Sequence, residues 1–209
     1  MKQKFRTSHE RDRKETEQKL IDAVGSIIKE EGFARVKING IAEKAGVSKI
    51  LIYRYFGDLN GLIIAFMKQK DFWSSYPLPD IKKEELSGFL KKMFRRQVRQ
   101  MRADKEFKEL YRWEISQKND FTGVIQKPRE ENGLKIIAMV KKLTKSAHSE
   151  VAAIATILSA AITYLVLFED FGNTYNGIDL RQDKGWNQIL KCIDSLIDLW
   201  MHSGDRNEK

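Results

Sequence analysis

Apolar residues recur at spacings of three and four along almost the whole chain, and no stretch alternates convincingly between apolar and polar positions. The first spacing places apolar side chains on one face of a helix, whereas a strand needs a period of two. The pattern therefore predicts an all-α protein. Its first helix is expected over about residues 16–31, with an apolar face formed by Leu20, Val24, Ile27 and Ile28.

Prolines divide the chain further along, because a proline inside a helix removes a backbone hydrogen bond. Pro77 and Pro79 predict a break before a long amphipathic helix. Pro128 predicts a second break, before a helix over about residues 129–146. The long amphipathic helix has an apolar side that consists of Leu86, Phe89, Leu90, Met93, Phe94, Gln97 and Met101.

Residues 151–168 carry no charge, and their length reaches the lower limit of a membrane span, about 17 to 20 residues. Much of this run is small or hydroxylated, which favours a buried helix of a soluble protein instead. Small residues allow helices to approach closely, so this run and the last helix predict an interface between two subunits, although both could simply fill one core. The interface candidates are Thr156, Ser159, Ala160, Thr163, Ile189, Ile193, Leu196 and Trp200.

Composition narrows the class of protein. The 209 residues are 42% apolar, enough for one large domain or two small ones with a real core. The single cysteine, Cys192, excludes an intramolecular disulfide, and three widely separated histidines make a structural metal site improbable. No GxSxG, P-loop, HExxH or CxxC motif occurs. We therefore expect neither an enzyme nor a bound cofactor.

The formal net charge of +9 indicates an anionic partner, with nucleic acid ahead of membrane. Residues 1–70 hold 15 of the 38 basic residues but only 9 of the 29 acidic ones, so the excess is concentrated at the N-terminal end. Residues 1–14 lack the apolar run of a signal peptide and are interpreted as a flexible basic arm of a cytoplasmic protein. The six basic residues between Lys91 and Arg102 are expected to form a solvated helix face.

Residues 38–56, INGIAEKAGVSKILIYRYF, have the pattern of a helix-turn-helix. Gly46 can adopt the positive φ that ends the first helix, and Ser48 is a strong N-cap for the second. Ile52 and Phe56 lie one turn apart and should form the buried side of that second helix. A short helix that presents Lys, Tyr and apolar residues from its first turns suits a major groove.

The chain resembles the N-terminal domain of TetR-type transcriptional regulators at Gly32-Phe33, Ile41-Ala42, residues 45–49, residues 53–56 and Leu62. The resemblance covers about 50 residues, and beyond it only the general helical layout is similar. It implies a three-helix DNA-binding domain followed by a helical bundle for ligand binding and dimerisation. It also implies a homodimeric repressor that binds double-stranded operator DNA and is released by a small-molecule effector.

The motif departs from the family pattern at three places. Ile50-Leu51 replaces a common Gly-Thr pair, Leu59 replaces a phosphate-binding Lys, and Lys37 stands where a capping Thr is typical. Operator preference is therefore expected to differ from that of better-known members. The residues expected to contact DNA are Lys37, Ser48, Lys49, Ile50, Leu51, Tyr53, Arg54 and Tyr55.

The predicted domains are the arm (residues 1–14), the DNA-binding domain (15–60) and an effector-binding and dimerisation domain (61–209). Glu114 lies on the apolar side of its helix, where a carboxylate needs a partner. It either pairs with an internal Arg or Lys or accepts hydrogen bonds from an effector. The other pocket candidates, each of which could instead be ordinary core, are Met93, Met101, Tyr111, Trp113, Met139, Tyr164 and Phe168.

The predicted function is thus a DNA-binding transcriptional regulator that acts as a dimer in the cytoplasm, without a membrane partner. The alternative is a helical interaction module or a membrane-associated protein built around residues 151–168.

Overall fold

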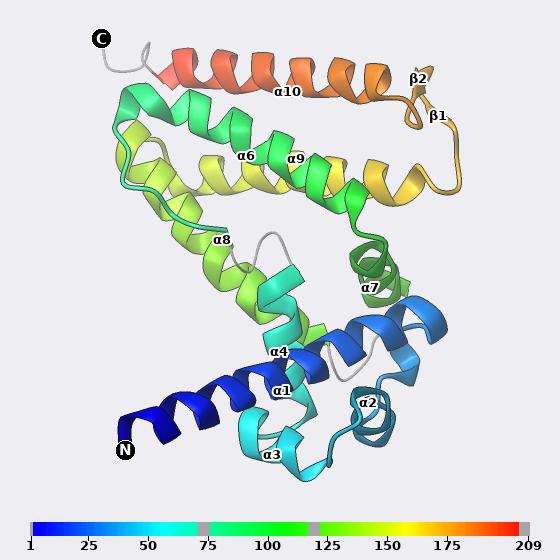
Figure 1. The fold of residues 1–209 in the computed structure, drawn as a ribbon. Coiled ribbons are helices and arrows are strands. Elements are labelled where there is room, and N and C mark those ends of the chain that lie inside the picture. Colours follow the sequence, from blue (N-terminus) through cyan, green and yellow to red (C-terminus); the bar gives the residue numbers. More distant parts are fainter. Residues whose placement is uncertain (1, 71–75, 117–121, 205–209) are drawn as a thin grey trace. The chain divides into compact units, whose positions relative to one another are not determined.

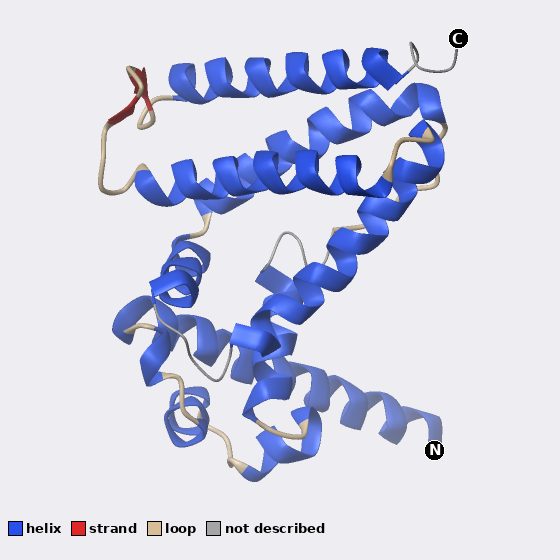
Figure 2. Ribbon diagram, turned by 180° about the vertical axis from the view of Figure 1, so that it is seen from behind, coloured by secondary structure: helices blue, strands red, loops and turns tan. Residues whose placement is uncertain are grey.

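A computed structural model describes residues 2–70, 76–116 and 122–204 of the chain (Figure 1). The described residues are almost entirely helical, so the predicted all-α class is confirmed. Among them, the strands are limited to β1 (Thr174–Tyr175) and β2 (Ile178–Asp179), which form a small antiparallel hairpin (Figure 2). Asn176 and Gly177 close this hairpin with positive φ angles of 48° and 78°, the combination that a two-residue turn requires.

Backbone contacts divide the chain into two units. Unit 1 comprises residues 1–75 with residues 105–129, and unit 2 comprises residues 76–104 with residues 130–209. Residues 61–70 and 105–116, which follow the predicted DNA-binding domain in the chain, pack against the first helix of unit 1. Each unit has its own buried core.

Unit 1 is built on a long first helix, against which most of its other helices pack. Leu20, Val24 and Ile28 of that helix are almost completely buried, together with Phe66 and Met67 from the fourth helix. The elements of the unit are α1 (Lys2–Glu31), η1 (Phe33–Arg35), α2 (Ile38–Ala45), α3 (Ile50–Phe56), α4 (Leu59–Lys70) and α7 (Lys105–Ser116).

The predicted flexible arm is helical in the structure. α1 begins at Lys2, not near residue 16, so residues 2–14 extend the first helix by more than three turns. This extension contains no glycine or proline and is rich in Lys, Arg, Glu and Gln, which are good helix formers. Ion pairs one turn apart, Arg13 with Glu17 (2.7 Å) and Glu15 with Lys19 (3.0 Å), support the helix where the apolar pattern is absent.

Unit 2 contains the helices α6 (Lys83–Ala103), α9 (His148–Phe168), α10 (Asp183–Gly204) and the C-terminal part of α8 (Thr122–Thr144). Figures 1 and 2 show α10 running alongside α6 and α9. The break before α6 is confirmed, since residues 76–82 are not helical. The predicted start of α8 after Pro128 is wrong, because the helix begins at Thr122 and continues through the proline. A proline inside a helix removes one backbone hydrogen bond and crowds the preceding turn. Beyond Pro128, the helix buries Ile136 and Val140.

The basic face of α6 is not simply solvated. Lys91 pairs with Asp198 (2.6 Å), Arg95 pairs with Asp194, and Arg102 pairs with Asp183 (2.9 Å), so acidic residues of α10 neutralise half of the run. The hydrogen bonds from Lys91 and Ser87 hold the pKa of Asp198 below its ordinary value. The charges of α6 therefore fasten α6 to α10.

Candidate nucleic-acid interface

The turn between α2 and α3 depends on Gly46. Its φ of 66° and ψ of 33° lie in the left-handed region, which glycine adopts without a steric penalty. The Gly46 N–H donates to the Glu43 carbonyl (3.1 Å) and the Val47 N–H donates to the Ala42 carbonyl (3.0 Å), which ends α2. The predicted helix-turn-helix is therefore formed as the spacing of its residues indicated.

α3 is anchored to the core of unit 1 by Ile52, which is completely buried. Ile41 and Ala42 of α2 are also buried. Phe56, which was predicted to share the buried face of α3, is only half-buried because it lies at the end of the helix. A single strong anchor therefore fixes which face of this short helix points away from the core.

The other side of α3 and the turn before it carry five of the residues predicted to contact DNA. Ile50 and Tyr53 keep 68% and 51% of their surface exposed. Ser48, Lys49 and Arg54 are exposed as well. Because α3 contains no acidic residue, it places no negative charge of its own against a phosphate backbone. We call these five residues the reading surface.

The other predicted contacts of α3 have a second role. Leu51 and Tyr55 are half-buried, and the Arg13 guanidinium of α1 lies 5.2 Å from the centre of the Tyr55 ring. This cation–π contact attaches α1 to the side of α3. Sequence reasoning did not single out Arg13, since no local pattern connects two residues that are 42 positions apart.

Lys37 occupies the N-cap position of α2 with an extended backbone, and its side chain makes no capping hydrogen bond. It is exposed, and within the described residues no ion pair neutralises it. Lys44, at the other end of α2, pairs with Glu30 (2.5 Å) instead. Of the two lysines, Lys37 is therefore the one whose charge is available to a phosphate.

Ser48 caps α3 less directly than predicted. The helix begins at Ile50 with Lys49 in the cap position, and the Ser48 hydroxyl accepts only a long hydrogen bond from the Ile50 N–H (3.4 Å). A tight turn precedes the helix, in which the Leu51 N–H donates to the Ser48 carbonyl (3.0 Å). The exposed hydroxyl can therefore also bind another partner.

The position of α3 relative to α4 depends on a glycine that the sequence did not mark. Asp58 caps α4, since its side chain accepts a hydrogen bond from the Gly61 N–H (2.8 Å). A β-carbon at Gly61 would lie 1.9 Å from the Phe56 carbonyl oxygen. Only glycine therefore allows the end of α3 to approach α4 this closely.

The residues predicted to line one effector pocket are divided between the two units. Tyr111, Trp113 and Glu114 belong to unit 1, whereas Met93, Met101, Met139, Tyr164 and Phe168 belong to unit 2. Met93 borders a small apolar cavity of about 40 Å³ with Leu90, Ile136 and Leu158. Tyr164, by contrast, lies on the outer side of α9, half exposed, where it stacks on Phe168 and makes an edge-to-face contact with Tyr175.

Glu114 has the internal partner that was one of its two predicted roles. Arg129 donates to its carboxylate at 2.5 Å, and both side chains are largely buried. The same guanidinium lies 3.9 Å from the centre of the Tyr111 ring and 5.7 Å from that of Phe107. Trp113 packs on Phe33 at 4.1 Å between ring centres. These four contacts are all within unit 1.

The candidates for a subunit interface divide between inner and outer faces. Thr156, Ala160 and Leu196 are exposed. Ile193 is buried within the chain, the Trp200 indole donates to Glu150 (2.8 Å), and Thr163 lies 3.5 Å from the Gln97 amide. Ser159 and Ile189 are half-buried. The outer face contains large apolar residues that were not predicted, notably Ile157 of α9 (66% exposed) and Leu199 of α10 (64% exposed).

Residues 150–168 of α9 are long and apolar enough to cross a membrane, yet only 28% of the corresponding window is buried in the chain. Most of this helix is therefore uncovered in a single chain, and its burial in a soluble protein stays a prediction. No cluster of His, Cys, Asp and Glu able to hold a metal ion occurs among the described residues.

Residues 20–66 match the family model of bacterial regulatory proteins of the tetR family. The match covers α2, α3 and most of α1 and α4. No curated protein sequence matches the chain.

Three solved structures share the fold over most of the chain. The fatty acid degradation regulator FadR from Bacillus halodurans is 20% identical, with a TM-score of 0.55 over 87% of this chain and 94% of that chain. The hemolysin II transcriptional regulator HlyIIR is 17% identical, with a TM-score of 0.52 over 88% and 97%. NalD of Pseudomonas aeruginosa, the secondary repressor of the MexAB-OprM multidrug efflux pump, is 16% identical, with a TM-score of 0.56 over 92% and 96%.

Proposed function

Because residues 20–66 match the family model of bacterial regulatory proteins of the tetR family, we propose that the chain is a homodimeric repressor that binds a pseudo-palindromic operator and is released by a small-molecule effector. It would act in the cytoplasm, and no catalytic step is assigned to it. The observation that carries this proposal is the reading surface of α3, anchored by Ile52 and free of acidic residues.

The reading surface suits a major groove because of its mixed chemistry. Lys49 and Arg54 offer charge to phosphates or to guanine, and the Tyr53 hydroxyl can bind a phosphate or a base edge. Exposed Ile50 has no packing role in the chain, so its hydrocarbon is available for a thymine methyl group. Lys37, at the start of α2, adds a phosphate contact. Leu51 and Tyr55 are half-buried, so only their exposed atoms would contact DNA.

A second subunit is needed because a seven-residue recognition helix covers few base pairs. The exposed apolar residues of α9 and α10 support a bundle of these helices with the same helices of a second chain. In such a bundle Ile157, Leu196 and Leu199 would be buried, together with Thr156 and Ala160. The alternative is that lipid covers this apolar face. A dimer that persists without detergent would exclude a membrane-bound protein.

The effector is proposed to act within the C-terminal helices. The cavity beside Met93 holds about 40 Å³, far below the roughly 300 to 1,000 Å³ of small-molecule sites. A ligand there would have to separate the surrounding helices, and it would release DNA if the expanded conformation binds the operator less well. Met139 and Met101 are flexible side chains that tolerate such repacking. Glu114 is engaged by Arg129 and would not bind the effector.

The DNA-binding proposal is tested by removing two side chains of the reading surface together. Operator sequences are first selected from random duplex DNA with the wild-type protein. The double variant Lys49→Ala and Tyr53→Ala should then lose at least about 30-fold in affinity, since each good contact contributes about 1–3 kcal/mol and 1.4 kcal/mol is tenfold. If Lys49 binds a phosphate in both half-sites, Lys49→Ala alone should also reduce the slope of log affinity against log salt by about 2, one for each subunit.

Lys68→Ala is the matched control, because Lys68 is an exposed lysine of α4 in the same unit. It should leave operator affinity nearly unchanged. If the double variant binds the selected operator as tightly as this control, α3 is not the recognition helix.

A further inference from the structure

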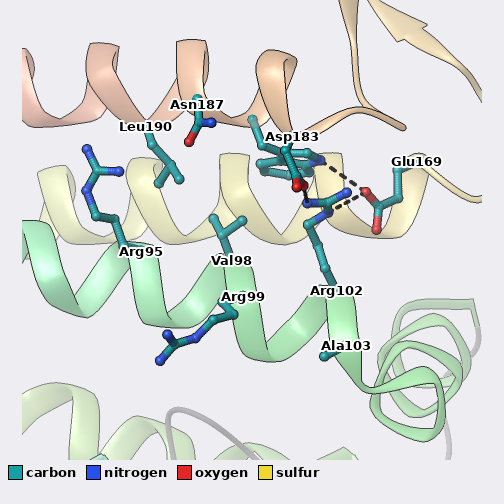
Figure 3. Close-up of a pocket in the computed structure, with 10 residues that line it drawn as sticks. Arg95, Val98, Arg99, Arg102, Ala103, Glu169, Asp183, Asn187 and Leu190 are labelled. Carbon is teal, nitrogen blue, oxygen red and sulfur yellow. Dashed lines mark hydrogen bonds and ion pairs between the residues drawn. The ribbon is translucent and has the colours of Figure 1, made fainter.

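A groove of about 500 Å³ lies along α6, next to the start of α10 and the end of α9, entirely within unit 2 (Figure 3). Its volume falls in the range of small-molecule sites, roughly 300 to 1,000 Å³. It is a different space from the small cavity beside Met93, because the two share no lining residue. Apolar Val98, Leu190 and Trp186 line its floor, and three arginines of α6 line its edge: Arg95, Arg99 and Arg102. We call this space the α6–α10 groove.

Arg102 is held in a fixed orientation. Its Nε donates to buried Glu169 (2.9 Å), and its guanidinium lies 5.3 Å from the centre of the Trp186 ring. The Trp186 indole donates to the same Glu169 oxygen (3.0 Å) and to the Leu180 carbonyl (2.8 Å), which fixes the aromatic surface as well. A guanidinium whose plane is fixed in advance loses little conformational freedom when it binds a planar or tetrahedral anion.

The outer side of the Arg102 guanidinium already holds a carboxylate, and that carboxylate is easy to displace. Nη1 donates to Asp183 (2.9 Å), as Figure 3 shows, yet the Asp183 side chain is 88% exposed. An exposed ion pair contributes little free energy, because water and salt screen it. Nη2 makes no hydrogen bond to any described residue. The arginine thus has one weakly held carboxylate and one further donor group directed away from Glu169.

One of the three arginines of the α6–α10 groove has no ion-pair partner among the described residues. The lining contains Arg95, Arg99 and Arg102 together with Glu169 and Asp183, which both pair with Arg102. Arg95 is paired with Asp194, whereas Arg99 is exposed and takes part in no ion pair among the described residues. The Arg99 guanidinium points away from α10 in Figure 3, and rotation of its long side chain can bring it to the groove. An anion that displaces Asp183 from Arg102 would therefore have Arg99 as a second, unpaired cation within the same lining.

We propose that the α6–α10 groove binds a small organic anion, whose carboxylate or phosphate group replaces Asp183 at Arg102 and whose apolar body lies against Val98 and Leu190. The exposed Asn187 amide at the rim can donate to the same anionic group. This site is independent of the proposed DNA binding, since it involves neither the reading surface nor the outer face of α9 and α10.

The test measures binding of phenyl phosphate, benzoate and neutral benzyl alcohol to the full chain. Tryptophan is replaced by 5-fluorotryptophan, and the Trp186 signal among the four tryptophans is identified with Trp186→Phe. The two anions should shift the Trp186 fluorine signal saturably, whereas benzyl alcohol should not. Asp183→Asn should tighten binding roughly two- to fivefold by removing the competing carboxylate, and Arg99→Gln should weaken it by a similar factor.

The matched control is Lys92→Gln, which removes the same charge from an exposed position of α6 outside the groove. It should change the affinity less than Arg99→Gln does. Arg102→Gln should abolish binding, but it also removes a partner of Glu169, so a circular dichroism melt must accompany it. The proposal is overturned if several millimolar of either anion leaves the Trp186 signal unshifted, or if Asp183→Asn and Arg99→Gln both bind like the wild type.

Discussion

At the scale of single residues, Gly61 shows how one missing β-carbon positions the recognition helix. A methyl group there would meet the Phe56 carbonyl oxygen at 1.9 Å, and the obstacle is backbone and not a side chain that could rotate away. The end of α3 would have to move. Because α3 carries the reading surface, a small displacement at Gly61 would be transmitted directly to the groups proposed to contact DNA.

We therefore expect Gly61→Ala to destabilise the protein by about 1–3 kcal/mol, the usual cost of overpacking, and to lower operator affinity beyond its effect on folding. Gly40→Ala is the control, because its β-carbon would meet only the Ile27 side chain, at 4.0 Å. In the interior of α2 that change should be neutral or stabilise by up to about 1 kcal/mol. Urea unfolding followed by operator titration separates the two effects. Equal behaviour of both variants would contradict the close approach of α3 and α4.

At the scale of elements, a buried ion pair joins α7 to α8. Glu114 and Arg129 have side chains that are only 5% and 13% exposed, so both charges have lost most of their hydration. Such a pair contributes modest net free energy when it is complete, but removing one partner is costly because the other charge stays buried. The pair therefore specifies which faces of the two helices meet.

Glu114→Gln should destabilise the protein by about 3–5 kcal/mol in denaturant unfolding. The double variant Glu114→Leu with Arg129→Met should recover most of this loss, since it leaves no charge in the apolar surroundings. Glu15→Gln is the control: Glu15 pairs with Lys19 on the solvent side of α1, and its pKa is lowered mainly by that partner, so no measurable change in stability is expected. A loss for Glu114→Gln no larger than that for Glu15→Gln would exclude a structural role of the pair.

At the scale of the whole molecule, the proposed mechanism depends on two copies of the chain. Ile157 of α9 and Leu199 of α10 are exposed, so neither side chain belongs to the buried core of the single chain. Covering them in a second subunit would bring two reading surfaces into one complex. Operator binding is then expected to require the dimer.

Ile157→Glu and Leu199→Glu should each shift the protein toward a monomer in sedimentation velocity, because a dimer would bury an unpaired carboxylate. The same variants should lose high-affinity binding to a two-half-site operator while each chain remains folded. Ile115→Glu provides the control, since Ile115 is 73% exposed on α7 and lies outside this face. A dimer that survives both substitutions would place the interface elsewhere.

The all-α class, the helix-turn-helix and the Asp58 cap were predictable from the sequence because they depend on residues no more than about four positions apart. Gly46 needs only its own backbone freedom, and Asp58 needs only the N–H of Gly61. Helical periodicity likewise identified Ile52 as the anchor that directs the reading surface outward. The polar N-terminal extension of α1 was missed because helix propensity and ion pairs produce no apolar period.

The tertiary structure alone decided which face of each helix meets which neighbour. Arg95 and Asp194 are 99 positions apart, and Arg102 and Glu169 are 67 apart, so no local pattern could pair them. Tyr164 and Ile193 have similar patterns of apolar neighbours, yet one lies outside and the other inside. Periodicity specifies that a helix has an apolar face, whereas the choice of partner for that face is made by packing between segments that are distant in the chain.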